Sequence, residues 1–324
     1  MEAWRRRLVF DPLPPLIAAE SEAIRYFARR DLLGESVPSV ASLWELNQAR
    51  RLLRKQKDNG SWPYLGARRT YLRSADNYDQ LETYRTVGEL VEKFGMTRDH
   101  SAVRIAADYL FSHQTDEGDF RGIYGTQYSP NYSAAILELL IKAGYARDDR
   151  IAQGFHWLLH IRQRDGGWAI PLRTVGAKLD SLMMKDDPVQ PDRSKPFSHL
   201  VTGVVVRAFA AHEQRRPSSA AMKAGTLLAS RFFRRDVYPD RSAAVFWTRF
   251  SYPFWFTDLL SSLDSLSRLG FDPQDAEIKQ ALAWFVAKQR SSGVWELKMV
   301  RGADKARTLW LSLAICCVIR SFCD

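Results

Sequence analysis

The chain of 324 residues is 46% hydrophobic and 26% charged, which is typical of a globular protein with a large core and excludes disordered and fibrous classes. Its net charge of +10 favours an anionic partner and leaves open a phosphate, an acidic polymer, a nucleic acid or an anionic lipid surface.

The N-terminal residues are basic and rich in proline. No apolar stretch of signal-peptide length precedes Asp11 and Pro12, so we expect a cytoplasmic protein. Residues 1–16 allow an extended arm on a single domain that spans residues 1–324. The longest apolar run, at residues 309–319, is too short to cross a bilayer and predicts a buried helix.

Four segments share one sequence pattern that recurs along the chain. They are QKDNGSW at residues 56–62, QTDEGDF at 114–120, RQRDGGW at 162–168 and QRSSGVW at 289–295. Each places a glycine two residues before an aromatic residue, and Arg162 stands where the other copies have glutamine. A worn copy, RFFRRDVY, lies at 231–238. Recurrence at roughly 50 to 70 residues predicts one repeat architecture along the chain.

Each copy is expected to follow a half-exposed helix and to precede a buried one. Residues 199–211 and 309–319 are apolar on nearly every face, whereas the stretch before Gln289 is amphipathic. This alternation predicts two concentric rings of helices. The helices predicted to lie outside precede Gln56, Gln114, Gln163 and Gln289, and those predicted to lie inside start near Tyr78, Asn131, Ser198 and Phe254. The glycines are expected to cap the outer helices in a left-handed conformation.

The spacing of glutamine, glycine and tryptophan resembles the QW motif of squalene-hopene and oxidosqualene cyclases, which protein prenyltransferase β subunits share in weaker form. The resemblance covers about residues 40–324. It implies an all-α fold, an α/α toroid made of a double ring of helical hairpins, with a central cavity for isoprenoid chains. It therefore favours a terpene-cyclase-like or isoprenoid-binding function, with a hydrophobic or anionic small molecule such as an isoprenoid diphosphate as ligand.

The catalytic motifs of these families are matched only in part. Class II cyclases protonate an alkene with the middle aspartate of a D-x-D-D motif. The nearest string, MKDDP, retains Asp186 and Asp187 but has Met184 in the first position. Asp258, next to an aromatic string, is a further candidate acid. No zinc ligand set like that of protein prenyltransferases is recognisable, so we expect neither a metal nor another cofactor.

Basic and aromatic residues follow the repeated pattern where the chain is expected to reach the mouth of the ring. The predicted anion-binding residues are Arg69, Arg73, Arg121, Arg173, Arg249 and Arg301. The string FWTRFSYPFWFTD at 246–258 supplies Trp247, Tyr252 and Trp255 as predicted ligand contacts. Solvated arginines and ordinary core aromatics are the alternative.

Two other functions fit the same features. One is a polysaccharide-lyase-like toroid acting on an acidic glycan, in which Tyr132 or His199 abstracts a proton. The expected cytoplasmic location argues against it. The other is a non-catalytic module for an anionic partner, which leaves nucleic acid and peripheral contact with an anionic membrane open. No transmembrane segment is expected.

Overall fold

The computed structural model describes residues 3–69, 73–178, 187–300 and 305–323. Within these ranges every regular element is a helix, and pairing of extended segments is limited to isolated bridges. The predicted all-α fold class is therefore confirmed. None of the described helices is sufficiently long and apolar to span a membrane.

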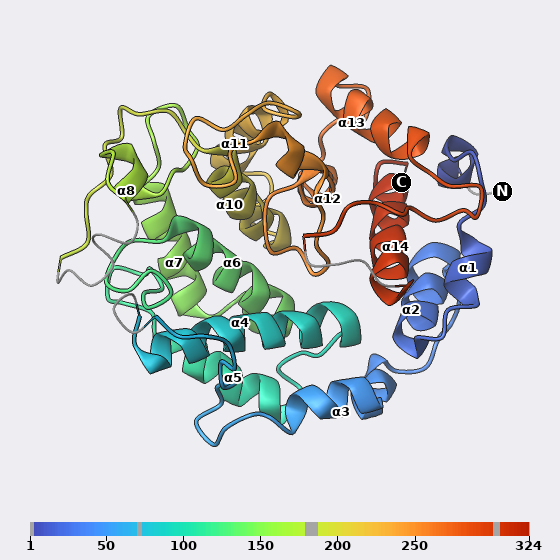
Figure 1. The fold of residues 1–324 in the computed structure, drawn as a ribbon, viewed down its shortest axis with the longest axis horizontal. Helices are drawn as coiled ribbons and strands as arrows, with labels where there is room; N and C mark the ends of the chain where they lie inside the picture. Colours follow the sequence, from blue (N-terminus) through green and yellow to red (C-terminus); the bar gives the residue numbers. More distant parts are fainter. Residues whose placement is uncertain (1–2, 70–72, 179–186, 301–304, 324) are drawn as a thin grey trace.

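The inner ring is built from apolar helices, each packed on the next (Figure 1). In chain order these helices are α4 (Ala75–Phe94), α6 (Pro130–Leu140), α10 (His199–Ala211), α12 (Leu259–Arg268) and α14 (Lys305–Ser321). The short helix α2 (Glu22–Phe27) packs against both α14 and α4, and so closes the ring. α10 contacts α6, α11 and α12, and only two of its 13 residues, Leu200 and Ala211, are not buried.

The outer ring is built from helices that keep one face in solvent. They are α3 (Asn47–Leu53), α5 (Ser101–Phe111), α7 (Asp149–His160), α11 (Ser219–Ala229) and α13 (Ala276–Ala287). α13 buries only Ile278, Ala281 and Phe285, which lie on one helical stripe. The predicted order of outer and inner helices is confirmed, except that α12 begins at Leu259 because the residues before it are not helical.

Short helices fill the remaining connections. They are α1 (Leu13–Ile17), α8 (Pro171–Thr174), η1 (Ala3–Arg7), η2 (Ala28–Leu32), η3 (Val40–Glu45), η4 (Ile141–Tyr145) and η5 (Ala244–Thr248). The extended arm expected at residues 1–16 is therefore not seen in its described part. Instead η1 and α1 pack on α14, because Trp4, Leu13 and Leu16 bury their side chains there.

The first two repeated turns join the preceding outer helix to the next one, whereas Gln163 of the third turn bonds to the carbonyls of Asp192 and Lys195 in a loop. The side-chain amide of Gln56 donates to the carbonyl of Gly60 in its own turn (3.0 Å) and to that of Ala102 in α5 (2.8 Å). Gln114 makes the same pair of bonds, to Gly118 and to Arg150 of α7.

The glycines of the pattern lie in these turns and not at the ends of the outer helices, so the predicted helix-cap role is wrong. Gly60 and Gly118 have φ values of 87° and 104° and follow the last helical residue by several positions. A Cβ on Gly60 would lie 2.4 Å from the carbonyl oxygen of Ile105, and one on Gly118 would lie 2.5 Å from that of Gln153. Glycine is required because the turn touches the next outer helix.

The tryptophans of the repeated turns are each anchored twice. The indole N–H donates to a carbonyl of the preceding outer helix at 2.6 or 2.7 Å in Trp62, Trp168 and Trp295. The backbone N–H of the same residues donates at 2.9 or 3.0 Å to the inner-helix hydroxyls of Thr83, Thr202 and Ser312. Because all three indoles are almost fully buried, these turns fasten the outer ring to the inner ring.

Candidate functional site

The connection between η5 and α12 enters the interior of the ring. We call residues 250–258 the central segment. Its first residue, Phe250, donates to the carbonyl of Lys298 (2.9 Å) and accepts from the N–H of Val300 (2.8 Å). Its last residue, Asp258, caps the N-terminus of α12. Both ends of the segment are therefore fixed.

Aromatic side chains of the central segment reach inner helices on two sides of the ring. Tyr252 stacks on Trp310 of α14, with ring centroids 5.4 Å apart and an interplanar angle of 16°. Trp255 meets Tyr84 of α4 edge-on, also at 5.4 Å. The segment therefore spans the space between α14 and α4.

Two glycines in the inner helices make room for this segment. A Cβ on Gly88 of α4 would lie 2.6 Å from the indole ring of Trp255, and one on Gly203 of α10 would lie 2.3 Å from the methyl group of Thr257. Thr257 also donates its hydroxyl to the carbonyl of Leu200 (2.6 Å). These glycines are explained by the close approach of the central segment.

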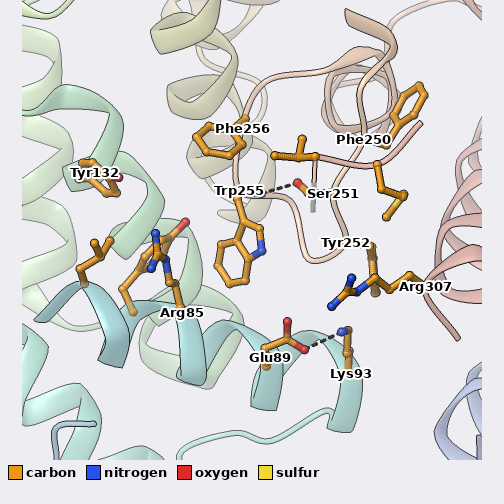
Figure 2. A pocket seen from close by; sticks show the side chains of 14 residues that line it. Arg85, Glu89, Lys93, Tyr132, Phe250, Ser251, Tyr252, Trp255, Phe256 and Arg307 are labelled. Carbon is orange, nitrogen blue, oxygen red and sulfur yellow. Dashed lines mark hydrogen bonds and ion pairs between the residues drawn. The ribbon is translucent and has the colours of Figure 1, made fainter. Parts of the chain in front are cut away.

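A cavity of about 340 Å³ lies beside the central segment, and we call it the aromatic cavity (Figure 2). Its aromatic lining residues are Tyr84, Tyr132, Phe250, Tyr252, Trp255 and Phe256. Charged residues of α4 and α14 also line it, namely Arg85, Glu89, Lys93 and Arg307. Glu89 and Lys93 form an ion pair of 2.6 Å. The cavity thus combines a large apolar wall with a charged side.

A second cavity of about 220 Å³, which we call the side cavity, shares four wall residues with the first. The shared residues are Tyr84, Tyr132, Trp255 and Phe256. Its own polar lining consists of Tyr124, Asn131, Asp240 and Arg241. Trp255 and Phe256 therefore border both spaces.

The tyrosines shared by the two cavities are neutral. Burial raises the pKa of the Tyr84 phenol, and burial also raises that of Tyr132 despite the opposing charges of Arg73 and Arg85. Their rings meet edge-on at 6.1 Å. Tyr132 is thus a wall residue at neutral pH and a poor proton acceptor.

A buried ionic cluster supports the central segment. Arg207 of α10 binds Glu138 of α6 (2.9 Å) and donates to the carbonyl of Phe256 (3.4 Å). Lys142 binds Glu138 (2.8 Å) and Glu92 (2.6 Å). Burial alone would raise the pKa of the Glu138 carboxyl, but the charges of Arg207 and Lys142 hold it below its ordinary value. The cluster is ionised and internally paired, so it acts as a support.

Asp258 is a buried carboxyl with one unused oxygen. Its Oδ1 accepts from the backbone N–H of Ser261 (2.8 Å), and its own N–H donates to the Ser261 hydroxyl (3.0 Å). Its Oδ2 is buried without a hydrogen-bond partner. Burial raises the pKa of Asp258 to about 7, although the hydrogen bonds from Ser261 oppose this. The carboxyl therefore retains a proton over part of the neutral range.

Asp258 lines neither cavity, and neither do Asp187 and His199 among the other predicted acids and bases. Asp186 lies outside the described residues, and Asp187 is exposed, with its backbone carbonyl bonded by the Gln127 side chain (3.1 Å). His199 is buried against Trp247 with ring centroids 4.6 Å apart, and it lines neither cavity. Burial lowers the pKa of His199 to about 4. His199 and Tyr132 therefore do not share a site that a glycan could enter.

The predicted aromatic contacts divide into two groups. Tyr252 and Trp255 line the aromatic cavity, as predicted for ligand contacts. Trp247 instead is 1% exposed and donates its indole N–H to the carbonyl of Arg234 (2.9 Å). It is buried and anchored like the tryptophans of the repeated turns, and its acceptor Arg234 lies in the worn copy at 231–238.

The predicted arginines within the described residues line neither cavity. Arg121 is paired with Asp119 and Arg173 with Asp240. Arg73 donates to the carbonyl of Ile123, Arg69 is exposed, and Arg249 packs against Phe246 with its Nε buried and unpartnered. Arg301 lies outside the described residues. Neighbouring carboxylates and carbonyls thus engage several of these side chains.

The basic residues that do line the two cavities were not among the predicted anion-binding residues. Arg85 and Arg307 line the aromatic cavity and Arg241 lines the side cavity. A signal exists for Arg85, since Arg85, Glu89 and Lys93 recur every four residues on a helix predicted to be buried. Arg241 lies in an irregular loop and belongs with Arg249 to the basic residues that follow the repeated pattern, but it was not among the predicted anion-binding residues.

The profile of the squalene-hopene cyclase C-terminal domain matches residues 79–188. This range contains Tyr84, Gly88 and Tyr132, together with two of the repeated turns. It confirms the resemblance inferred from the QW-like pattern. A comparison with curated proteins finds no match.

Solved structures with detectable similarity include a protein from Actinoplanes, 16% identical over 88% of this chain and 100% of that chain, with a TM-score of 0.31. Another is the type II terpene cyclase MstE from Scytonema, 12% identical over 87% of this chain and 96% of that chain, with a TM-score of 0.34. A variant of it in complex with its substrate, geranylgeranyl dihydroxybenzoate, is 13% identical over 88% and 97%, with a TM-score of 0.37. Similarity this low establishes no shared activity.

Proposed function

We propose, starting from the similarity of residues 79–188 to the squalene-hopene cyclases, that this chain is a terpene-cyclase-like protein that binds an isoprenoid in the aromatic cavity. The observation that carries the proposal is the aromatic wall beside the central segment. Type II terpene cyclase MstE has geranylgeranyl dihydroxybenzoate as substrate. By analogy, the ligand here is an isoprenoid chain joined to a polar head group.

The wall suits such a ligand for two reasons. The rings of Trp255, Tyr252 and Phe256 offer apolar contact area to a hydrocarbon chain. Their faces also carry partial negative charge, which stabilises a carbocation held over them. Because burial keeps Tyr84 and Tyr132 neutral, no phenolate is present to quench the cation.

Asp258 lines neither cavity, but it follows the shared wall residue Phe256 by two positions, and it is the acid we assign to the reaction. Its carboxyl would transfer a proton to one carbon of a terminal alkene, and the carbocation would then be attacked by the π electrons of the next double bond to form a ring. Loss of a proton from the final cation returns a proton to the carboxylate or to water, so the product is an isomer of the substrate. Asp258 suits this role because its pKa, raised by burial, keeps it partly protonated near neutral pH.

The test is to incubate the protein with geranylgeraniol, geranylgeranoic acid and geranylgeranyl diphosphate separately and to analyse the extracts by gas chromatography and mass spectrometry. We expect from at least one substrate a product of unchanged mass with fewer double bonds. Asp258→Asn should abolish this product while leaving the affinity for the substrate unchanged.

Two further variants separate the cavity from the rest of the fold. Trp255→Ala should weaken substrate binding, whereas Trp44→Ala should not, because Trp44 packs against His100 beside the outer ring. Binding without turnover in all three substrates would leave an isoprenoid-binding protein and reject the cyclase. The absence of binding would reject both.

A further inference from the structure

Arg241 has a partly buried side chain with unused hydrogen-bond donors. It lines the side cavity, and its Nε and Nη2 atoms are buried and have no hydrogen-bond partner among the described residues. The adjacent Asp240 is unsuited as a partner because Arg173 binds it through two bonds of 2.6 and 2.7 Å. Asp258 acts on Arg241 through its charge, without a hydrogen bond. A buried guanidinium without hydrogen bonds is costly, so its presence indicates a missing partner.

Aromatic rings pack against the guanidinium of Arg241. Its Cζ lies 4.2 Å from the ring centre of Phe246 and 4.1 Å from that of Phe256. The N–H donors of a guanidinium lie in its plane, where they point away from rings stacked on it. Donors arranged in this way match the two oxygens of a carboxylate.

The backbone of Arg241 is also unusual. Its φ of 47° is in the left-handed region, which non-glycine residues seldom adopt. Such a conformation costs about 1 kcal/mol or more and persists where the surroundings require it, often at ligand sites. The strain and the missing partner occur at the same residue.

We propose that Arg241 binds a carboxylate head group of the ligand in the side cavity. This subsite rests on the proposed function, with the hydrocarbon chain in the aromatic cavity and the head group beyond Trp255, which borders both spaces. Asn131 and Tyr124 line the same side cavity and add polar groups, and the Asn131 side-chain amide donates to the Tyr124 hydroxyl (3.4 Å). One unpaired guanidinium matches the single charge of a carboxylate better than the larger charge of a diphosphate.

The test compares farnesoic acid, farnesol and octanoate as ligands of the wild type, Arg241→Gln and Arg164→Gln, by isothermal titration calorimetry. Arg164 is exposed and far from the cavity lining, so its variant is the matched control. We expect the wild type and Arg164→Gln to bind farnesoic acid about tenfold or more tightly than farnesol. Arg241→Gln should bind both equally, with unchanged affinity for farnesol.

Each other outcome overturns a definite part of the proposal. Equal binding of farnesoic acid and farnesol by the wild type rejects the subsite and retains the isoprenoid ligand, whether or not the variant folds. If the wild type binds octanoate but neither farnesoic acid nor farnesol, and Arg241→Gln does not bind octanoate, the carboxylate subsite is supported and the proposal of an isoprenoid ligand is rejected. Should no ligand bind the wild type, both the subsite and the proposed function are rejected.

Discussion

The repeated turns and the central segment are both rich in aromatic residues, but they differ in how completely their buried polar atoms are hydrogen-bonded. In the turns, Trp168 donates its indole N–H to Leu158 and its backbone N–H to Thr202, so every donor of the buried tryptophan is used. Asp258, at the end of the central segment, and Arg241 both retain buried atoms without partners. The turns also contain unpartnered buried atoms, the side-chain oxygens of Gln114 and Gln163, but those groups are neutral amides. An unpartnered buried carboxyl or guanidinium is more costly, so these two groups point to a role other than folding. The turns hold the rings together, which allows the interior to carry groups suited to a ligand.

The largest expected effect is the difference in free energy of unfolding between a tryptophan variant in a repeated turn and one in the central segment. Trp168→Ala removes a fully buried indole and should lower the free energy of unfolding by about 3–5 kcal/mol. Trp255 is only half-buried, so Trp255→Ala should cost below about 2 kcal/mol. Urea denaturation of the two variants and the wild type measures both values. A larger loss from Trp255→Ala would show that the central segment, and not the turns, holds the fold together.

The pH dependence of stability sharpens the contrast at Asp258. Because burial raises its pKa from the ordinary value to about 7, the folded state binds more protons than the unfolded state between about pH 4 and pH 7. Its contribution to stability therefore falls as pH rises through this window, by up to about 4 kcal/mol. Asp258→Asn removes this contribution and retains an acceptor for the helix cap.

Urea unfolding of the wild type and Asp258→Asn at pH 4.5 and pH 7.5 tests this expectation. The variant should gain stability relative to the wild type as the pH rises. An equal pH dependence of both proteins would show that the Asp258 carboxyl ionises normally.

Removing a side-chain hydroxyl that accepts a hydrogen bond from a backbone N–H should cause an intermediate loss of stability. Thr202→Val leaves the buried N–H of Trp168 without an acceptor and should cost about 1–3 kcal/mol. Ser251→Ala removes the hydroxyl that accepts from the N–H of Trp255 (3.1 Å), and the cost should be below about 1 kcal/mol because Trp255 is half-exposed. Thermal unfolding of both variants measures the difference. Equal losses would mean that the two regions are equally dependent on these bonds.

The smallest effect on stability is expected at Gly88. In Gly88→Ala the new Cβ would meet Trp255, while the gain in helix propensity of up to about 1 kcal/mol offsets the overlap. Stability should therefore change by less than about 1 kcal/mol, whereas the affinity for farnesol should fall about tenfold as the indole moves into the cavity.

Gly154→Ala is the matched control, since it crowds Leu137 and not the cavity. Its effect on stability should be similar, and its affinity for farnesol should equal that of the wild type. Unchanged affinity in Gly88→Ala would show that Trp255 does not shape the binding site.

The double ring could be predicted because the same sequence pattern recurs between helices that alternate between half-exposed and buried. Each copy places glutamine, glycine and an aromatic residue at the same spacing, and the helices on either side differ in exposure, as α13 and α10 show. The expected arm at residues 1–16 was wrong because three apolar side chains, separated by arginines and prolines, show no helical period. Their burial depends on contact with α14, which is distant in sequence.

The candidate site could be predicted only in part. Tyr252 and Trp255, which line the aromatic cavity, were chosen because they lie in a dense aromatic string. Tyr132 was chosen as a base near the start of an inner helix, and the structure instead makes it part of the cavity wall. Arg241 was not singled out from the other arginines of these connections, because its unpartnered nitrogens depend on the pairing of the adjacent Asp240 with Arg173, a contact across 67 residues of chain. Whether an arginine side chain finds an acidic partner depends on contacts between distant parts of the chain, which the sequence pattern does not show.

The last repeated turn closes on the beginning of the chain. The side-chain oxygen of Gln289 accepts from the backbone N–H groups of Val9 and Phe10, and its amide donates to the carbonyl of Phe10 (2.8 Å). A Cβ on Gly293 would lie 2.2 Å from the carbonyl oxygen of Asp11. Gln289 follows Val9 by 280 positions, so during synthesis this joint can form only after the helices between them have left the ribosome. A circularly permuted chain that opens at a different outer turn should therefore assemble the same ring in a different order.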